Sequence, residues 1–166
     1  MARVKSLINA NNNALQVRKK VIKSITASAS LAAADSGKLF VLNAADAGST
    51  AVTVTLPAAT GSGRYYRIVV GTVNAMSDGY KIQVADSTDT IDGQIVTAST
   101  GDTPDLGQPW VTAAASDTVT FDGTTTGGVA IGDWIEVIDI ASNQWVISGQ
   151  TTSSGTEATP FSAAVS

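Results

Sequence analysis

The fourteen carboxylates are the side chains of this 166-residue chain best suited to chemistry, because cysteine and histidine are both absent. Asp86, Asp89 and Asp92 lie close together, within seven residues. A calcium loop of the EF-hand type takes ligands at positions 1, 3 and 5 and ends on a glutamate, whereas these aspartates are spaced three apart and no glutamate follows. The spacing favours a solvated loop whose side chains bond nearby backbone N–H groups. A calcium site is the alternative.

The residue types give little support to catalysis. Serine is plentiful, but the histidine that usually activates a serine nucleophile is missing, and Lys38 and Lys81 lie in no motif that would replace it. A glycosidase needs two carboxylates about 5–10 Å apart across a cleft, and no pair stands out. The glycines at 61–63 and 127–128 lack the Lys-Ser/Thr of a phosphate-binding loop. We therefore predict that the protein is not an enzyme and has no cofactor or metal.

Aromatic residues are the next candidates, as binding contacts. Trp134 and Trp145 lie in a predicted hairpin, where they would form a sugar-binding platform or pack in the core or a subunit interface; the sequence favours packing. Trp110 follows a proline in a Gly/Pro-rich loop. It is predicted to be an exposed contact, together with Tyr65 and Tyr66.

Basic residues concentrate at the N-terminus, where residues 1–23 hold six of the ten and no acid. These six are Arg3, Lys5, Arg18, Lys19, Lys20 and Lys23. A basic arm on an acidic body could bind nucleic acid phosphates, contact an acidic protein neighbour or be a solvated tail. The arm lacks an aromatic residue for base stacking, and nucleic acid would repel the acidic body. We expect protein contact and no nucleic acid partner.

The elements that must position these residues are short strands. Apolar–polar alternation between turn clusters predicts an all-β domain at 24–150, an antiparallel sandwich or jelly-roll-like barrel of about nine or ten strands. An extended arm at 1–23 and a small-residue tail at 151–166 flank it. The shared parity of Leu15, Val17, Val21 and Ile25 favours the extended arm, and a short helix at 14–23 is the alternative. The clearest strands are 38–42, 52–56, 64–70, 80–84, 91–96, 117–121, 133–138 and 144–148, and the last two form the strongest hairpin candidate.

Neither a signal-peptide apolar region nor a run of about 18–20 apolar residues is present. We therefore expect a protein made in the cytoplasm and without a membrane partner.

The segment from Ile25 to Gly149 resembles small β-rich virion proteins of tailed bacteriophages, namely head decoration (cement) proteins and head-fibre and tail-associated relatives. The residues that carry the resemblance are 31–44 (LAAADSGKLFVLNA), 52–59 (VTVTLPAA), 63–72 (GRYYRIVVGT), 132–137 (GDWIEV) and 144–149 (QWVISG). The arm and the tail lie outside it.

The resemblance implies a non-enzymatic protein on the capsid surface of a virion. It would bind the major capsid protein, bridge neighbouring subunits and form a homotrimer; no residue-level site is implied. The basic arm would then contact the capsid. The alternative is a fibre-type module that recognises host-surface glycan through Trp110, Tyr65 and Tyr66.

Overall fold

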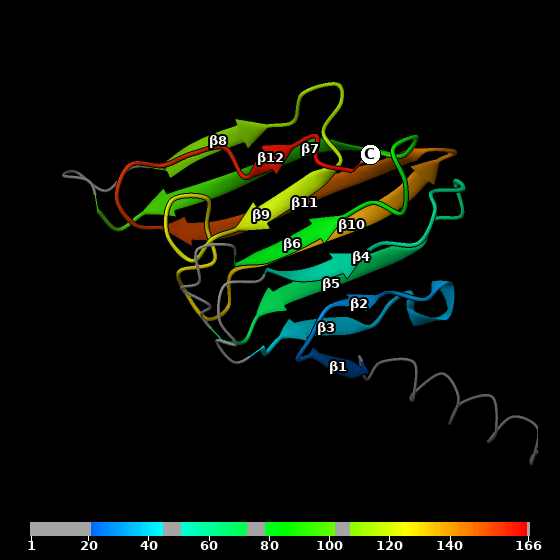
Figure 1. Cartoon of the computed structure of the whole chain (residues 1–166), viewed down its shortest axis with the longest axis horizontal. Helices are drawn as coiled ribbons and strands as arrows, with labels where there is room; N and C mark the ends of the chain where they lie inside the picture. Colours follow the sequence, from blue (N-terminus) through cyan, green and yellow to red (C-terminus); the bar gives the residue numbers. More distant parts are fainter. Residues whose placement is uncertain (1–20, 45–50, 73–78, 102–106, 166) are drawn as a thin grey trace, which may run out of the picture.

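The computed structural model describes residues 21–44, 51–72, 79–101 and 107–165. Within these ranges, twelve strands form two sheets packed face to face, and one 3₁₀ turn spans Ala33–Asp35 (Figure 1). The order is β1-β3-β5-β10-β11-β7-β8 in the seven-stranded sheet and β12-β9-β6-β4-β2 in the five-stranded sheet. The all-β prediction is confirmed. Its details were wrong, because there are about twelve strands and both sheets are mixed.

The strands agree with the sequence prediction where apolar and polar residues alternate over several consecutive positions. The seven-stranded sheet consists of β1 (Ile22–Ile25), β3 (Leu39–Leu42), β5 (Tyr65–Val70), β7 (Thr90–Ser99), β8 (Gly107–Val111), β10 (Trp134–Ala141) and β11 (Gln144–Ser153). The five-stranded sheet consists of β2 (Ala29–Ser30), β4 (Val52–Thr55), β6 (Tyr80–Gln83), β9 (Thr118–Phe121) and β12 (Phe161–Ser162). The four strands missed from sequence are β1, β2, β8 and β12, which lack clear apolar–polar alternation, and β2 and β12 are only two residues long.

The first six strands form a parallel coil. They alternate between the sheets, so β1, β3 and β5 pair in parallel in one sheet while β2, β4 and β6 do so in the other. Parallel neighbours require a crossover connection, and here the intervening strand of the opposite sheet provides it. The prediction of an antiparallel sandwich failed here because alternation reports which face a side chain occupies, not the direction of its strand.

The second half of the chain is mainly antiparallel. β10 and β11 form the predicted hairpin, with Trp134 opposite Gln150 and Ile138 opposite Val146. Asn143 turns the chain with a φ of 63°, a left-handed conformation that asparagine tolerates better than most residues. The hairpin joins the coil through β5 and continues through β7 to the edge strand β8. The site described below lies across this junction.

The core between the sheets is apolar at its centre and polar at one end. The rings of Phe40, Tyr66 and Trp145 form a chain, with centroids 6.0 Å and 5.8 Å apart. Further along β7 and β11, buried Thr97 and Thr151 are Cα partners whose hydroxyl oxygens lie 2.9 Å apart. Each hydroxyl thus satisfies the other in a site away from water.

This hydroxyl pair gives a prediction about stability. Thr97→Val or Thr151→Val alone strands the remaining hydroxyl and should lower the free energy of unfolding by about 1–3 kcal/mol. The double variant removes both polar groups and should come close to the wild type. Urea unfolding of the four proteins measures this cycle. Additive losses in the double variant would mean that the two hydroxyls do not depend on each other.

Strands of the two sheets extend into the regions predicted as arm and tail. Lys23 lies within β1, while β11 continues to Ser153 and β12 adds buried Phe161 to the five-stranded sheet. The carboxylate of Asp117 accepts hydrogen bonds from the backbone N–H of Ala164 and Val165. Small residues can be held in this way because strand pairing uses backbone groups. No helix in the described ranges is long and apolar enough to cross a membrane.

Candidate functional site: the outer face of the seven-stranded sheet

The outer faces of the two sheets differ in chemistry. The five-stranded sheet turns hydroxyl, amide and ammonium groups outward, as solvent-facing sheets usually do. Its outward residues include Thr53, Thr55, Lys81, Gln83 and Thr120. The seven-stranded sheet departs from this rule, because apolar side chains occupy many of its outward positions.

Most of the large, highly exposed apolar side chains of the described residues lie on this one face. They are Val111 (70% exposed), Ile22 (65%), Ile140 (50%), Val96 (42%) and Ile138 (36%). The strand registers place further apolar residues, Leu39, Val41, Val69 and Val146, among them. Contiguous exposed apolar surface of this kind marks an interaction site in soluble proteins.

The centre of the face carries an aromatic and arginine cluster. β5 and β10 are the third and fourth strands of seven, and their outward residues are Tyr65 and Arg67 on β5 and Trp134 and Glu136 on β10. The Arg67 guanidinium carbon lies 4.0 Å from the centroid of the Trp134 ring, and its Nη1 lies 3.9 Å from Glu136 Oε2. Tryptophan, tyrosine and arginine near the centre of a surface are typical of binding hot spots.

Charge is sparse on this face. Within the strands of the seven-stranded sheet, only Arg67, Glu136 and Asp92 place a charge on the outer side. Depletion of charge at the centre is a compositional mark of protein–protein interfaces. We therefore take the outer face as the candidate functional site.

The three aromatic residues predicted to be exposed contacts lie in different environments. Tyr65 lies on the outer face, but Tyr66 is fully buried and donates its hydroxyl proton to the Ala32 carbonyl at 3.1 Å. Trp110 is Cα partner to buried Ile95, packs against the core, and its buried indole N–H has no acceptor among the described residues. The prediction of exposure is therefore wrong for Tyr66 and Trp110.

The two remaining tryptophans have different environments. Trp145 is fully buried in the aromatic chain, as the packing interpretation predicted. Trp134 is half-buried on the outer face instead. Trp134 was weighed from sequence only together with Trp145, as a sugar-binding platform or as packing, and Arg67 was not predicted as a site residue. Trp134 shares the parity of Glu136 within one predicted strand, and this was the signal that could have placed its side chain on the outer face.

A buried carboxylate fixes the loop that leads into β5. Asp139 is fully buried on the inner side of β10. It accepts hydrogen bonds from the backbone N–H groups of Thr60 (3.0 Å), Gly61 (2.6 Å) and Ser62 (3.1 Å) and from two hydroxyls, those of Thr60 (3.2 Å) and Ser62 (2.6 Å). Asp139 therefore ties β10 to the chain just before Tyr65, the first residue of the central cluster on β5.

Two of the buried aspartates, Asp139 and Asp89, show pKa shifts in opposite directions. Burial raises the pKa of Asp139, but the hydrogen bonds from Ser62, Gly61 and Thr60 outweigh burial and hold that pKa below its ordinary value. Burial also raises the pKa of Asp89, whose hydrogen bond from the Ala59 N–H is not enough to reverse the effect. The hydrogen bonds to the 60–62 loop thus account for the lowered pKa of Asp139, without a role for this carboxylate in acid–base catalysis.

The three aspartates considered for calcium binding each accept hydrogen bonds from a different part of the chain. Asp86 accepts hydrogen bonds from the Thr88 backbone and hydroxyl, Asp89 from Ala59, and Asp92 from the Gln144 amide at 2.8 Å. Among the described residues, no group of three or more Asp, Glu, His or Cys side chains is placed to hold a metal ion.

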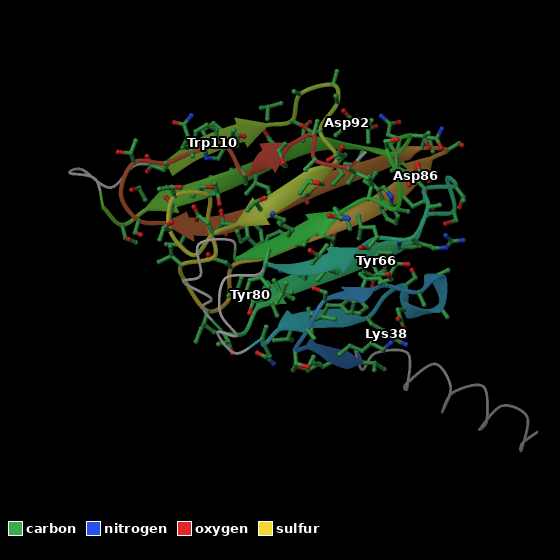
Figure 2. All side chains as sticks on the ribbon, in the orientation of Figure 1. Lys38, Tyr66, Tyr80, Asp86, Asp92 and Trp110 are labelled. Atoms are coloured by element: carbon green, nitrogen blue, oxygen red, sulfur yellow. The ribbon has the colours of Figure 1, made fainter. Side chains whose placement is uncertain are left out.

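A shallow groove of about 580 Å³ lies at the margin of the face, where β7, β8 and β11 meet. It is lined by Asp92, Gly93, Gln94, Val111, Thr112, Ile147 and Ser148. Figure 2 shows Asp92 and Trp110 at this end of the sheets and Lys38 at the opposite end. At Gly93, with a φ of 136°, an added Cβ would lie 2.1 Å from the Ile147 carbonyl oxygen, so only glycine fits.

Of the basic residues predicted to contact a capsid, the structure describes only Lys23; Arg3, Lys5, Arg18, Lys19 and Lys20 lie outside the described residues. Lys23 binds within its own subunit, with Nζ 2.8 Å from the Asp35 carboxylate, which also binds Lys38. Hydrogen bonds from Lys23 and then Lys38 lower the pKa of Asp35 to about 2. Asp35 thereby anchors β1 to the 3₁₀ turn.

The Asp35 bridge predicts a specific pH dependence. Because the folded-state pKa lies below the ordinary value of 3.8, the bridge stabilises the fold fully above about pH 4 and progressively less as the pH falls towards 2. Asp35→Asn should therefore lower the melting temperature at pH 7, and the difference from the wild type should shrink between pH 5 and 2. Thermal unfolding across this range tests it. A pH-independent difference would exclude the bridge as the cause.

Comparison of the chain with known protein families, characterised proteins and solved structures finds no match.

Proposed function

We propose that the protein is a structural virion protein that decorates the head of a tailed bacteriophage. In this proposal it forms a homotrimer, docks with the outer face of its seven-stranded sheet, and bridges neighbouring major capsid protein subunits. The observation that carries the proposal is the contrast between the two outer faces. One is apolar, with an aromatic and arginine centre, and the other is rich in threonine.

The way in which such a protein would stabilise a capsid follows from differential affinity. A protein that binds the expanded shell but not the unexpanded one shifts the equilibrium towards expansion by its binding free energy. Many identical contacts on one shell would make a modest individual affinity collectively strong. A rigid two-sheet body is suited to this task because it need not reorder on binding.

The charge distribution supports a second contact with the capsid. Five basic residues and no acid precede the described body, whose own charge is acidic. We expect those five side chains to approach an acidic capsid surface, with a salt-dependent contribution to binding.

Neutralising the five basic side chains tests their contact with the capsid. The full-length quintuple variant R3Q, K5Q, R18Q, K19Q and K20Q should bind expanded heads at least about tenfold more weakly, at roughly 1.4 kcal/mol per decade, and with less salt dependence. Co-sedimentation with expanded and unexpanded heads measures occupancy. Lys81→Gln, on the outer face of the five-stranded sheet, is the control. Undiminished occupancy of the quintuple variant would reject a role for the arm.

The groove favours one alternative, a module that binds host-surface glycan. Asp92, Gln94, Thr112 and Ser148 bring carboxylate, amide and hydroxyl groups to an open groove beside Val111, a donor and acceptor set that could bond sugar hydroxyls. In that case a glycan array should give a signal that Gln94→Ala abolishes. Retention of signal in Gln94→Ala, or no signal for the wild type, would count against glycan binding in the groove.

A further inference from the structure

The first turn of the parallel coil supplies an edge strand to each of the two sheets. β1 is the edge of the seven-stranded sheet and β2 the edge of the five-stranded sheet, and Figure 1 shows the two at the same end of the molecule. A coil that ends in this way presents unpaired backbone groups unless something caps it. The exposed side chains of Val21 (57%) and Ile22 lie at this edge.

The hydrogen bonds to β3 identify which backbone groups of β1 are free. The N–H of Leu39 donates to the Val21 carbonyl at 3.0 Å, and that of Asn43 donates to the Ile25 carbonyl at 2.8 Å. Backbone groups of successive strand residues point to opposite sides. Hence the N–H and C=O groups of Ile22 and Ser24 point away from the sheet, towards the free edge.

The opposite edge of the same sheet is protected. The N–H of Thr112 donates to the Gly93 carbonyl at 3.0 Å, so the alternate residues Pro109 and Val111 face outward from β8. Proline has no N–H to donate, and this is a common way of blocking an edge strand. The β1 edge is therefore the better template for an added strand.

The chain itself contains a segment suited to this edge. Twenty residues precede Val21, enough to reach about 66 Å when extended. Leu15 and Val17 alternate with the polar residues Gln16 and Arg18, which is the pattern of a strand with one apolar face.

This segment is poorly placed to fold back onto its own β1. The only residues between Val17 and β1 are Arg18, Lys19, Lys20 and Val21. None of them is the Gly, Asn, Asp or Pro that a tight hairpin requires, and a tight turn would crowd three positive charges. A neighbouring copy meets neither obstacle.

We propose that residues 13–17 of one copy add as a strand to the free edge of β1 in the next copy. Backbone hydrogen bonds to Ile22 and Ser24 would supply affinity, as in other strand-addition complexes. Such a head-to-tail contact closes into a ring when the rotation between copies permits, and three copies would give the trimer of the proposed function. The contact involves this chain alone, so its test needs no capsid.

The absence of cysteine allows a direct cross-linking test. Two differently tagged full-length copies are co-expressed, one carrying Ser24→Cys and the other a single cysteine at Ala14, Leu15, Gln16 or Val17. We expect a disulfide-linked pair of differently tagged chains for at least one position under mild oxidation, and none when Val111→Cys replaces Ser24→Cys. No link at any position, or equal linking to Val111→Cys, would overturn the proposal.

A proline substitution tests the edge without cysteine. Ile22→Pro removes only an outward-facing N–H and should leave the pairing with β3 intact, so circular dichroism should be unchanged while the mass in solution falls to that of one chain. Val111→Pro on the opposite edge should retain the wild-type mass. Wild-type mass for Ile22→Pro would refute the strand addition, whereas failure to bind heads would bear only on the proposed function.

Discussion

Asp139→Ala is expected to lower the free energy of unfolding by about 3–5 kcal/mol, a large part of the roughly 5–15 kcal/mol that stabilises a typical domain. The variant removes the acceptor of three backbone N–H groups and two hydroxyls in the 60–62 loop; the Asp139 side chain is fully buried, whereas residues 60–62 are exposed. The freed donors can bond water, so the expected loss is the net value of hydrogen bonds to a charged acceptor, about 1.5–3 kcal/mol for each and less than additive for all five. The loop also precedes Tyr65, so the outer face should lose order with it.

Urea unfolding followed by tryptophan fluorescence measures this loss. Asp139→Asn keeps one acceptor oxygen and should fall between the wild type and the alanine variant. Asp86→Ala is the matched control, because Asp86 is exposed and bonds only its local turn; its urea midpoint should match that of the wild type. A loss below about 1 kcal/mol for Asp139→Ala would show that the loop does not depend on this carboxylate.

Trp134→Ala should weaken binding to expanded heads by at least about 30-fold, the size expected when a hot-spot aromatic is truncated. The ring lies at the centre of the outer face and carries the Arg67 guanidinium 4.0 Å from its centroid. Truncation therefore removes both apolar contact area and the support of a positive charge. Because Trp134 points away from the core, the fold should persist with a loss of only about 1 kcal/mol.

Binding isotherms of full-length variants on purified heads measure this effect. Thr53→Ala, on the outer face of the five-stranded sheet, is the matched control and should bind like the wild type. Ile138→Ser, beside the central cluster, should give a smaller loss than Trp134→Ala. Equal binding by all three variants would mean that the outer face of the seven-stranded sheet does not carry the contact.

The positions of most strands could be predicted from sequence because alternation is a local property. In β4, Val52 and Val54 face the core while Thr53 and Thr55 face outward, as the pattern indicates. Strand direction and partner choice depend on contacts between distant segments, such as Val54 with Ile82. No local pattern encodes these, so the parallel coil was missed.

The candidate site was only partly predictable for a related reason. In β5, both Tyr65 and Tyr66 suit either side of a strand, and both were predicted to be exposed. Arg67 shares the parity of Tyr65, but Arg64 shares that of Tyr66, so the charges of the predicted strand could not assign either tyrosine to one side. The face as a whole emerges only when the register brings the outward residues of seven strands together.

The most direct test of this account is a cryo-electron microscopy reconstruction of expanded phage heads saturated with the full-length protein. The account predicts that the outer face of the seven-stranded sheet, with Trp134 and Arg67 at its centre, is buried against the major capsid protein. The threonine-rich outer face of the five-stranded sheet should point to solvent. Heads that remain bare, or a bound protein whose seven-stranded sheet faces solvent, would contradict it.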